Sequence, residues 1–217
     1  MSDSALHTRG KLSSSVLLWA SWVAASTAAI LLGFAILYLS IFLAQAVIPG
    51  VNEDRVFGYI MFPVLAALLG ILQWVVLRKR MARAGWWVAA TAGGLLVGRA
   101  AAGGCAQVAG RVLGRDYYVG QMLLPFDAII VGLSLGLAQI PVLRQHIRGW
   151  VLWVLLSALG WLALGLVMGV SIDRTADMVA LGAIPAAFSG LALLWLWRAE
   201  TGEGASSPSP GVVNERK

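Results

Sequence analysis

The sequence predicts an all-α polytopic integral membrane protein with six transmembrane helices, built as three helical-hairpin repeats. Charged residues make up only 12% of the 217 residues and hydrophobic residues 59%, whereas an ordinary soluble domain is roughly 25% charged. The charge-free runs include several long enough for the ~20 residues that a helix needs to cross a bilayer. A water-soluble fold is excluded, because too few charged side chains are present to cover its surface.

The charge-free runs place the six spans in order along the chain. The first run is too long for the apolar part of a signal peptide, so it should remain as a helix that tilts, kinks or extends into the interface. We expect residues 1–15 to be a cytoplasmic tail with little order at its start, and residues 199–217 to be a disordered cytoplasmic tail. The predicted spans are 16–46, 57–78, 86–107, 120–143, 150–171 and 178–198.

Two motifs recur in the same order, which predicts the hairpin repeat. The first opens the odd-numbered spans, at Trp22–Ser26, Trp87–Thr91 and Trp153–Ser157. The second, G-x-x-Q-x-x-x-L-R, closes the even-numbered spans at 70–78 and 136–144; its third copy at 190–198 has Leu193 in place of glutamine. Chance alignment of common residues is the alternative. The matched order and spacing of both motifs favour a repeat of about 65 residues in the first two copies.

Basic residues predict which ends of the helices face the cytoplasm. They gather in the two short linkers and beside the terminal spans, so the positive-inside rule puts both termini inside. Tryptophans at these same ends (Trp19, Trp22, Trp86, Trp87, Trp150, Trp153, Trp195 and Trp197) are expected to form an interfacial belt. The basic residues set the topology and could bind anionic lipid headgroups; they are Arg78, Lys79, Arg80, Arg83, Arg144, Arg148 and Arg198.

Small residues are expected to pack the helices together. Apolar burial contributes little between helices in lipid, so close backbone approach becomes the main packing device. We expect the small-residue faces of the three even-numbered spans to meet at the centre of the bundle. The glycines predicted to pack helices are Gly33, Gly70, Gly98, Gly136 and Gly190.

Gln73 and Gln139 lie three residues after two of these glycines and should point into the protein. They could hydrogen-bond a substrate. Alternatively they could bond each other or a neighbouring carbonyl, as interhelical polar residues do for roughly 0.6 kcal/mol.

Arg99 and Asp127 are the charges inside predicted spans that have no charged counterpart in the other copies. A charge within a membrane is a candidate functional site because it is costly to bury. In one interpretation they pair and line a polar cavity open to the outside. In the other, the third span ends near Gly98 and Asp127 lies at the outer end of the fourth. For a transporter or channel, the candidate polar site comprises Arg99, Asp127, Gln73 and Gln139. The predicted cavity mouth comprises Gln107, Arg111, Arg115, Asp116, Tyr117 and Tyr118.

Residues for enzyme chemistry are sparse. His7 and His146 both lie outside the predicted spans and Cys105 is the single cysteine, so neither a zinc site nor a histidine-based catalytic cluster can form in the bilayer. We therefore expect no metal, no cofactor and no enzymatic activity. The net charge of +6 is explained by topology, and no nucleic-acid partner is expected.

The two complete G-x-x-Q-x-x-x-L-R segments, each followed by a span of small residues that begins with tryptophan, resemble those of a group of uncharacterised multi-pass bacterial membrane proteins. The resemblance covers Gly70 to Gly98 and Gly136 to Gly165. It implies the bacterial cytoplasmic membrane and a six-span hairpin-repeat bundle, and it carries no known activity.

Three classes of function remain from the sequence. The first is a non-enzymatic membrane component, embedded in the lipid bilayer, that binds a protein partner or assembles as a homo-oligomer. The second is a small-solute transporter or channel, suggested by the repeats and by the polar residues within spans. An enzyme acting on lipid comes last, because no catalytic constellation is found.

Overall fold

The computed structural model describes residues 3–47, 60–81, 84–113, 125–144, 149–168 and 174–203. This part of the chain is helical and contains no strand, which confirms the all-α class. Its six helices are α1 (Asp3–Val47), α3 (Phe62–Leu77), α4 (Trp86–Leu113), α5 (Pro125–Leu143), α6 (Trp150–Met168) and α7 (Arg174–Glu203).

Five of these helices contain segments long and apolar enough to cross a membrane. The remaining helix, α3, is equally apolar but has 16 residues, about 24 Å at 1.5 Å per residue. Large apolar side chains cover the outside of the molecule; Leu137, Leu155 and Leu166 are more than half exposed. A surface of this kind indicates a protein embedded in a membrane. The segments are Ser15–Val47, Trp86–Ala109, Pro125–Leu143, Trp150–Met168 and Ala176–Trp195.

Several helix boundaries differ from the sequence prediction. Helix α1 begins at Asp3, so most of the expected N-terminal tail is helical, because a long apolar helix propagates cheaply into residues that lack proline. Helix α4 continues to Leu113 and α7 to Glu203, past the predicted ends. Helix α3 begins only at Phe62, with proline in its first turn, where proline is favoured. Residues 48–59 and 204–217 lie outside the described residues.

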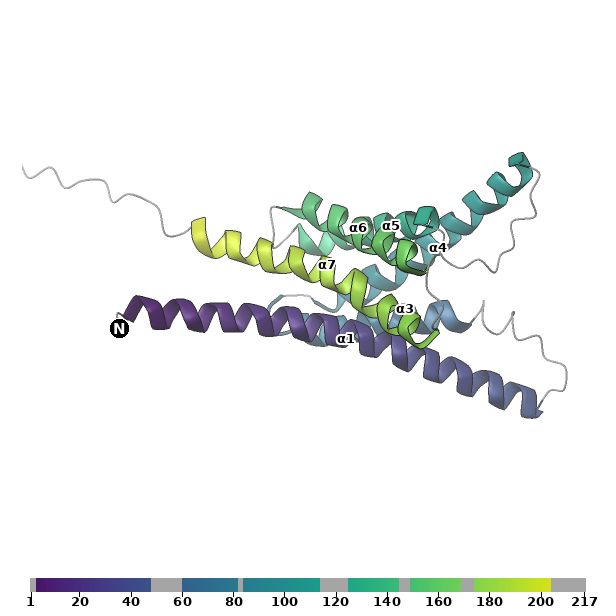
Figure 1. The fold of residues 1–217 in the computed structure, drawn as a ribbon, viewed down its shortest axis with the longest axis horizontal. Helices are drawn as coiled ribbons and strands as arrows, with labels where there is room; N and C mark the ends of the chain where they lie inside the picture. Colours follow the sequence, from purple (N-terminus) through teal and green to yellow (C-terminus); the bar gives the residue numbers. More distant parts are fainter. Residues whose placement is uncertain are drawn as a thin grey trace, which may run out of the picture.

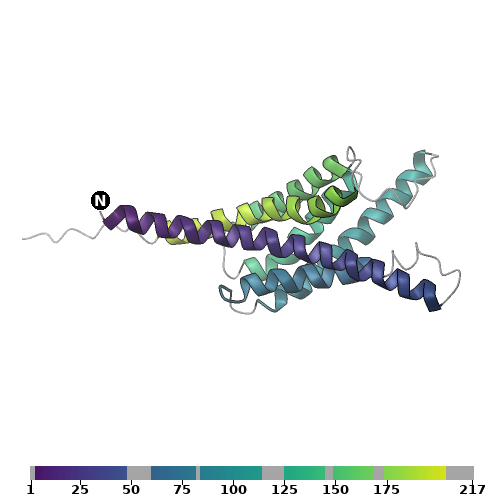
Figure 2. The ribbon, with the colours of Figure 1, turned by 60° about the horizontal axis from the view of Figure 1, so that its bottom comes forward.

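The helices form a closed ring (Figures 1 and 2). Each of the helices packs against its neighbours along the chain, and α7 closes the ring by packing along α1. The described ends of the chain, the start of α1 and the end of α7, lie at the same end of the molecule (Figure 1). At the opposite end, α1 and α4 extend beyond the rest of the ring (Figure 2).

The five predicted packing glycines all lie against a neighbouring helix, yet the faces of the even-numbered spans do not meet at the centre. Those spans are α3, α5 and α7, and their glycines face α4, α6 and α1, which are the odd-numbered spans. A Cβ on Gly70 would lie 3.0 Å from the Val88 Cα of α4, and one on Gly136 would lie 3.0 Å from the Val154 Cα of α6. The expected meeting is wrong because large side chains of the odd-numbered spans fill the centre. The other contacts are Gly33 with Leu65, Gly98 with Val131 and Gly190 with Trp19.

Candidate functional site

Three tryptophans of the first motif meet at the centre of the ring. Trp22 of α1, Trp87 of α4 and Trp153 of α6 are each at most 1% exposed. Their ring centroids lie 5.6 to 6.1 Å apart with interplanar angles of 74° to 76°, the edge-to-face arrangement that aromatic quadrupoles favour. We call these three side chains the tryptophan cluster.

The tryptophan cluster corrects the expectation of an interfacial belt for these three residues. Trp86 and Trp195 are 69% and 58% exposed, as belt residues would be. The residue next to Trp86, Trp87, points to a different side of the helix, because successive positions on a helix are about 100° apart. The belt prediction is therefore wrong for Trp22, Trp87 and Trp153, and it stays a prediction for the outward-facing tryptophans.

Gln73 supplies the acceptor that a buried indole N–H requires. The Trp87 Nε1 donates to the Gln73 Oε1 at 3.0 Å, and the Gln73 Nε2 donates to the Ser26 Oγ at 3.1 Å. One amide thus joins α1, α3 and α4. Gln73 is 5% exposed, so both bonds are buried.

Gln139 makes an equivalent pair of hydrogen bonds to the helices on either side of α5. The Trp153 Nε1 donates to the Gln139 Oε1 at 2.9 Å, and the Gln139 Nε2 donates to the Thr91 Oγ1 at 2.9 Å. Gln139 therefore joins α4, α5 and α6. Both glutamines bridge neighbouring helices, which favours the structural interpretation of these residues over substrate binding.

The third tryptophan uses a different acceptor, because the third copy of the motif has lost its glutamine. The Trp22 Nε1 donates to the Ser189 Oγ at 3.1 Å, and the Ser189 Oγ donates to the Pro185 carbonyl at 2.9 Å. Ser189 lies one helical turn before Leu193 in α7. It joins α7 to α1 and completes the hydrogen bonds around the tryptophan cluster.

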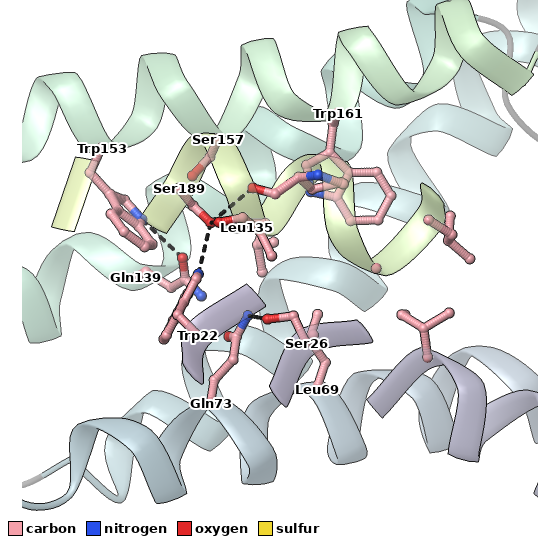
Figure 3. A pocket seen from close by; sticks show the side chains of 15 residues that line it. Trp22, Ser26, Leu69, Gln73, Leu135, Gln139, Trp153, Ser157, Trp161 and Ser189 are labelled. Atoms are coloured by element: carbon pink, nitrogen blue, oxygen red, sulfur yellow. Dashed lines mark hydrogen bonds between the residues drawn. The ribbon is translucent and has the colours of Figure 1, made fainter. Parts of the chain in front are cut away.

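A small cavity lies beside Trp22 and Trp153 of the tryptophan cluster (Figure 3). Its volume is about 30 Å³, whereas a water molecule needs roughly 10–15 Å³ by the same kind of measure. It has room for one or two water molecules. Polar side chains from five helices line it, namely Ser26, Gln73, Gln139, Ser157 and Ser189.

Arg99 and Asp127 lie apart from this cavity, so the structure does not gather the four residues of the predicted polar site. Asp127 precedes Gln139 by twelve residues on α5, about 18 Å by helical rise. The Arg99 guanidinium lies 5.0 Å from the centre of the Phe62 ring, in a cation–π contact. Arg99 attracts Asp127 electrostatically, yet no ion pair within 4.0 Å joins these two described side chains.

The positions of Arg99 and Asp127 on their helices can be compared with the two interpretations, a paired site within the spans or two residues at the ends of spans. Asp127 is buried in the first turn of α5, where the helix dipole favours a negative charge. This agrees with its lying at the outer end of that helix. Helix α4 does not end near Gly98 but continues past Arg99. On that extension Gln107 and Arg111 are exposed; the remaining residues of the predicted mouth lie outside the described residues.

The described basic residues of the two short linkers are exposed. Arg78, Lys79, Arg80 and Arg144 lie at the ends of α3 and α5, and the Arg78 guanidinium lies 5.6 Å from the centre of the Trp74 ring. The side chains of Arg83, Arg148 and Arg198 lie outside the description. Within the described residues, His, Cys, Asp and Glu form no group of three that could hold a metal ion.

The hydrogen-bond partners of the two glutamines were not predicted from the sequence. In the first motif a hydroxyl follows each tryptophan by four residues, as Ser26, Thr91 and Ser157. That spacing puts both side chains on one face of the helix, which could have indicated a shared network.

Comparison with known proteins found no matching family model, curated protein or solved structure.

Proposed function

We propose that this chain is a non-enzymatic component of the bacterial cytoplasmic membrane that binds a protein partner or further copies of itself. It has six spans in three hairpin repeats, with α3 and the apolar residues before it as the second span, and both termini in the cytoplasm. The matched bonds of Gln73 and Gln139 support the repeat. Exposed basic residues at the ends of α3 and α5 support the orientation, and the sequence resemblance supports the bacterial location.

One observation carries the proposed class: both glutamines at the centre of the ring are bonded to side chains of neighbouring helices. Gln73 and Gln139 each use the amide oxygen and nitrogen on neighbouring helices. The cavity beside them is about 30 Å³. A packed and internally bonded centre stabilises the ring, and it leaves the outer surface as the place for interaction.

The outer ends of α1 and α4 offer that surface. They extend beyond the ring (Figure 2), and Phe42, Val47 and Val108 are 68%, 77% and 60% exposed. Gly103 and Gly104 of α4 have no neighbouring atom within 4 Å of an added Cβ. Small residues of this kind allow close approach of another membrane helix, so we propose this region of α4 as the docking face.

Cys105 allows a direct test, because it is exposed on the same part of α4. A maleimide–diazirine reagent attached to Cys105 through the thiol and then irradiated in native membranes should cross-link this position, by carbene insertion, to a second copy or to a partner subunit identified by mass spectrometry. The control is Cys105→Ala with Leu155→Cys, which moves the thiol to an exposed position on α6. We expect no specific adduct from the control. Absence of an adduct at Cys105, or equal adducts from both proteins, would refute the proposed docking face.

A small-solute transporter or channel is the second candidate, favoured by a cavity lined from α1, α3, α5, α6 and α7. Flux of small neutral solutes into proteoliposomes tests it. The first proposal predicts flux equal to that of protein-free liposomes. Solute-selective flux above that background would favour the transporter.

A further inference from the structure

The third copy of the repeat differs from the others at two buried positions that lie one helical turn apart. In α3 these positions are Leu69 and Gln73, and in α5 they are Leu135 and Gln139. In α7 they are Ser189 and Leu193. A small hydroxyl thus replaces the leucine, and a leucine replaces the glutamine one turn later.

The first consequence is a buried hydroxyl without its glutamine. Ser26 and Thr91 accept bonds from Gln73 and Gln139 at 3.1 and 2.9 Å. Ser157 is their counterpart in the first motif and is 3% exposed. At the position where the other copies have Gln73 and Gln139, the copy that contains Ser157 has Leu193. The leucine side chain has no hydrogen-bonding atom.

The second consequence is a helix carbonyl without its backbone donor. Pro185 lies inside α7 and has no N–H, so it cannot donate to the carbonyl four residues earlier, that of Leu181. Leu181 and Pro185 both line the cavity. In membrane helices, carbonyls freed by proline are often satisfied by ordered water.

These groups surround a space of the right size. The cavity of about 30 Å³ is lined by Leu181, Pro185, Ser157, Ser189 and Gln139. Figure 3 shows the last three of these around it. A buried water needs roughly 10–15 Å³ and two to four polar partners. We propose that one or two water molecules bind here between α6 and α7, bonded to the Ser157 hydroxyl and the Leu181 carbonyl. The site lies inside the ring and does not depend on the proposed docking face.

A structure of the protein in lipid, at a resolution that shows ordered water, tests this site. In the wild-type protein, water should lie within about 2.7–3.2 Å of the Ser157 Oγ. The double variant Ser189→Leu, Leu193→Gln restores in α7 the residue types of α3 and α5. We expect it to lose this water, because the introduced amide should bond to Ser157 and Trp22. Leu191→Ile, at a half-exposed position of α7, is the control and should keep the water.

Xenon provides a second measurement on the wild-type protein, because it enters dry apolar cavities and not hydrated ones. We expect no xenon in this cavity under pressure. Xenon bound there, or a wild-type structure without water beside Ser157, would overturn the proposal whether or not the double variant folds. Water that persists unchanged in a folded double variant would overturn the assigned cause.

Discussion

The buried indole N–H groups of the tryptophan cluster explain why glutamine is found at the centre of this protein. An indole nitrogen has one donor and no acceptor, while an amide offers both. Gln139 can therefore accept from Trp153 and donate to Thr91 at once. For Trp22 the acceptor is Ser189, whose hydroxyl accepts from the indole N–H and donates to the Pro185 carbonyl of its own helix.

Replacing Gln139 with leucine should destabilise the ring. The variant would leave the Trp153 N–H buried without an acceptor, which costs about 1–3 kcal/mol, although bonds between membrane helices average only about 0.6 kcal/mol. We expect a loss of about 1–2 kcal/mol in the free energy of unfolding, measured by titration with a denaturing detergent.

Leu137→Ala is the matched control on the same helix, because Leu137 is 53% exposed. It should cost less than Gln139→Leu, since it removes no buried hydrogen bond. Equal losses from the two variants would show that the amide bonds do not matter for stability.

The inward direction of Gln73 and Gln139 was predictable from their spacing after glycine, but their partners were not. The sequence allowed bonds between the two glutamines or to a neighbouring carbonyl. Serine, threonine and tryptophan fill these roles because α1, α4 and α6 present them at the same height. Periodicity gives the face of one helix, and only packing brings a second helix to that face.

Glycines at the contacts between neighbouring helices determine how closely the helices approach. Gly93 and Gly94 are adjacent on α4 and show the difference. A Cβ on Gly94 would lie 2.9 Å from the Leu135 Cα of α5, whereas a Cβ on Gly93 would meet nothing within 4 Å. The same residue type therefore has different roles one position apart.

Gly94→Ala should lower the free energy of unfolding, whereas Gly93→Ala should not. The first forces backbone apart and should cost about 1–3 kcal/mol. The second should be neutral or stabilising by up to about 1 kcal/mol, because alanine favours the helix over glycine. Thermal unfolding in detergent measures both. A Gly94→Ala protein as stable as the wild type would refute the close contact between α4 and α5.

At the scale of the whole molecule, contact between the first and last helices closes the ring. Helix α7 packs along α1, with the Trp19 Nε1 donating to the Ala187 carbonyl at 3.2 Å. The described ends of the chain lie at one end of the molecule (Figure 1). In a closed ring, every helix keeps the same two neighbours wherever in the ring the chain is cut.

A circular permutant tests the closure. The chain would begin at Ala84, continue to Lys217, and pass through a flexible linker to Met1 and on to Arg83. Permutation is tolerated where the cut falls in a connecting segment, so we expect a folded protein whose unfolding midpoint falls by no more than about 5 °C. A cut between Gly98 and Arg99, inside α4, is the control and should prevent folding. Similar aggregation of both would contradict the closed ring.

The sequence by itself determined the membrane class, the all-α fold and the approximate positions of the helices, because low charge and long apolar runs allow only helices in lipid. It also indicated the inward face of Gln73 and Gln139. The tertiary structure decided which helices are neighbours, that the tryptophan cluster lies inside, and that Arg99 and Asp127 lie apart from the glutamines. The reason is physical: in lipid every apolar helix face is acceptable to the solvent, so hydrophobicity cannot choose partners, and close contacts and buried hydrogen bonds do so instead.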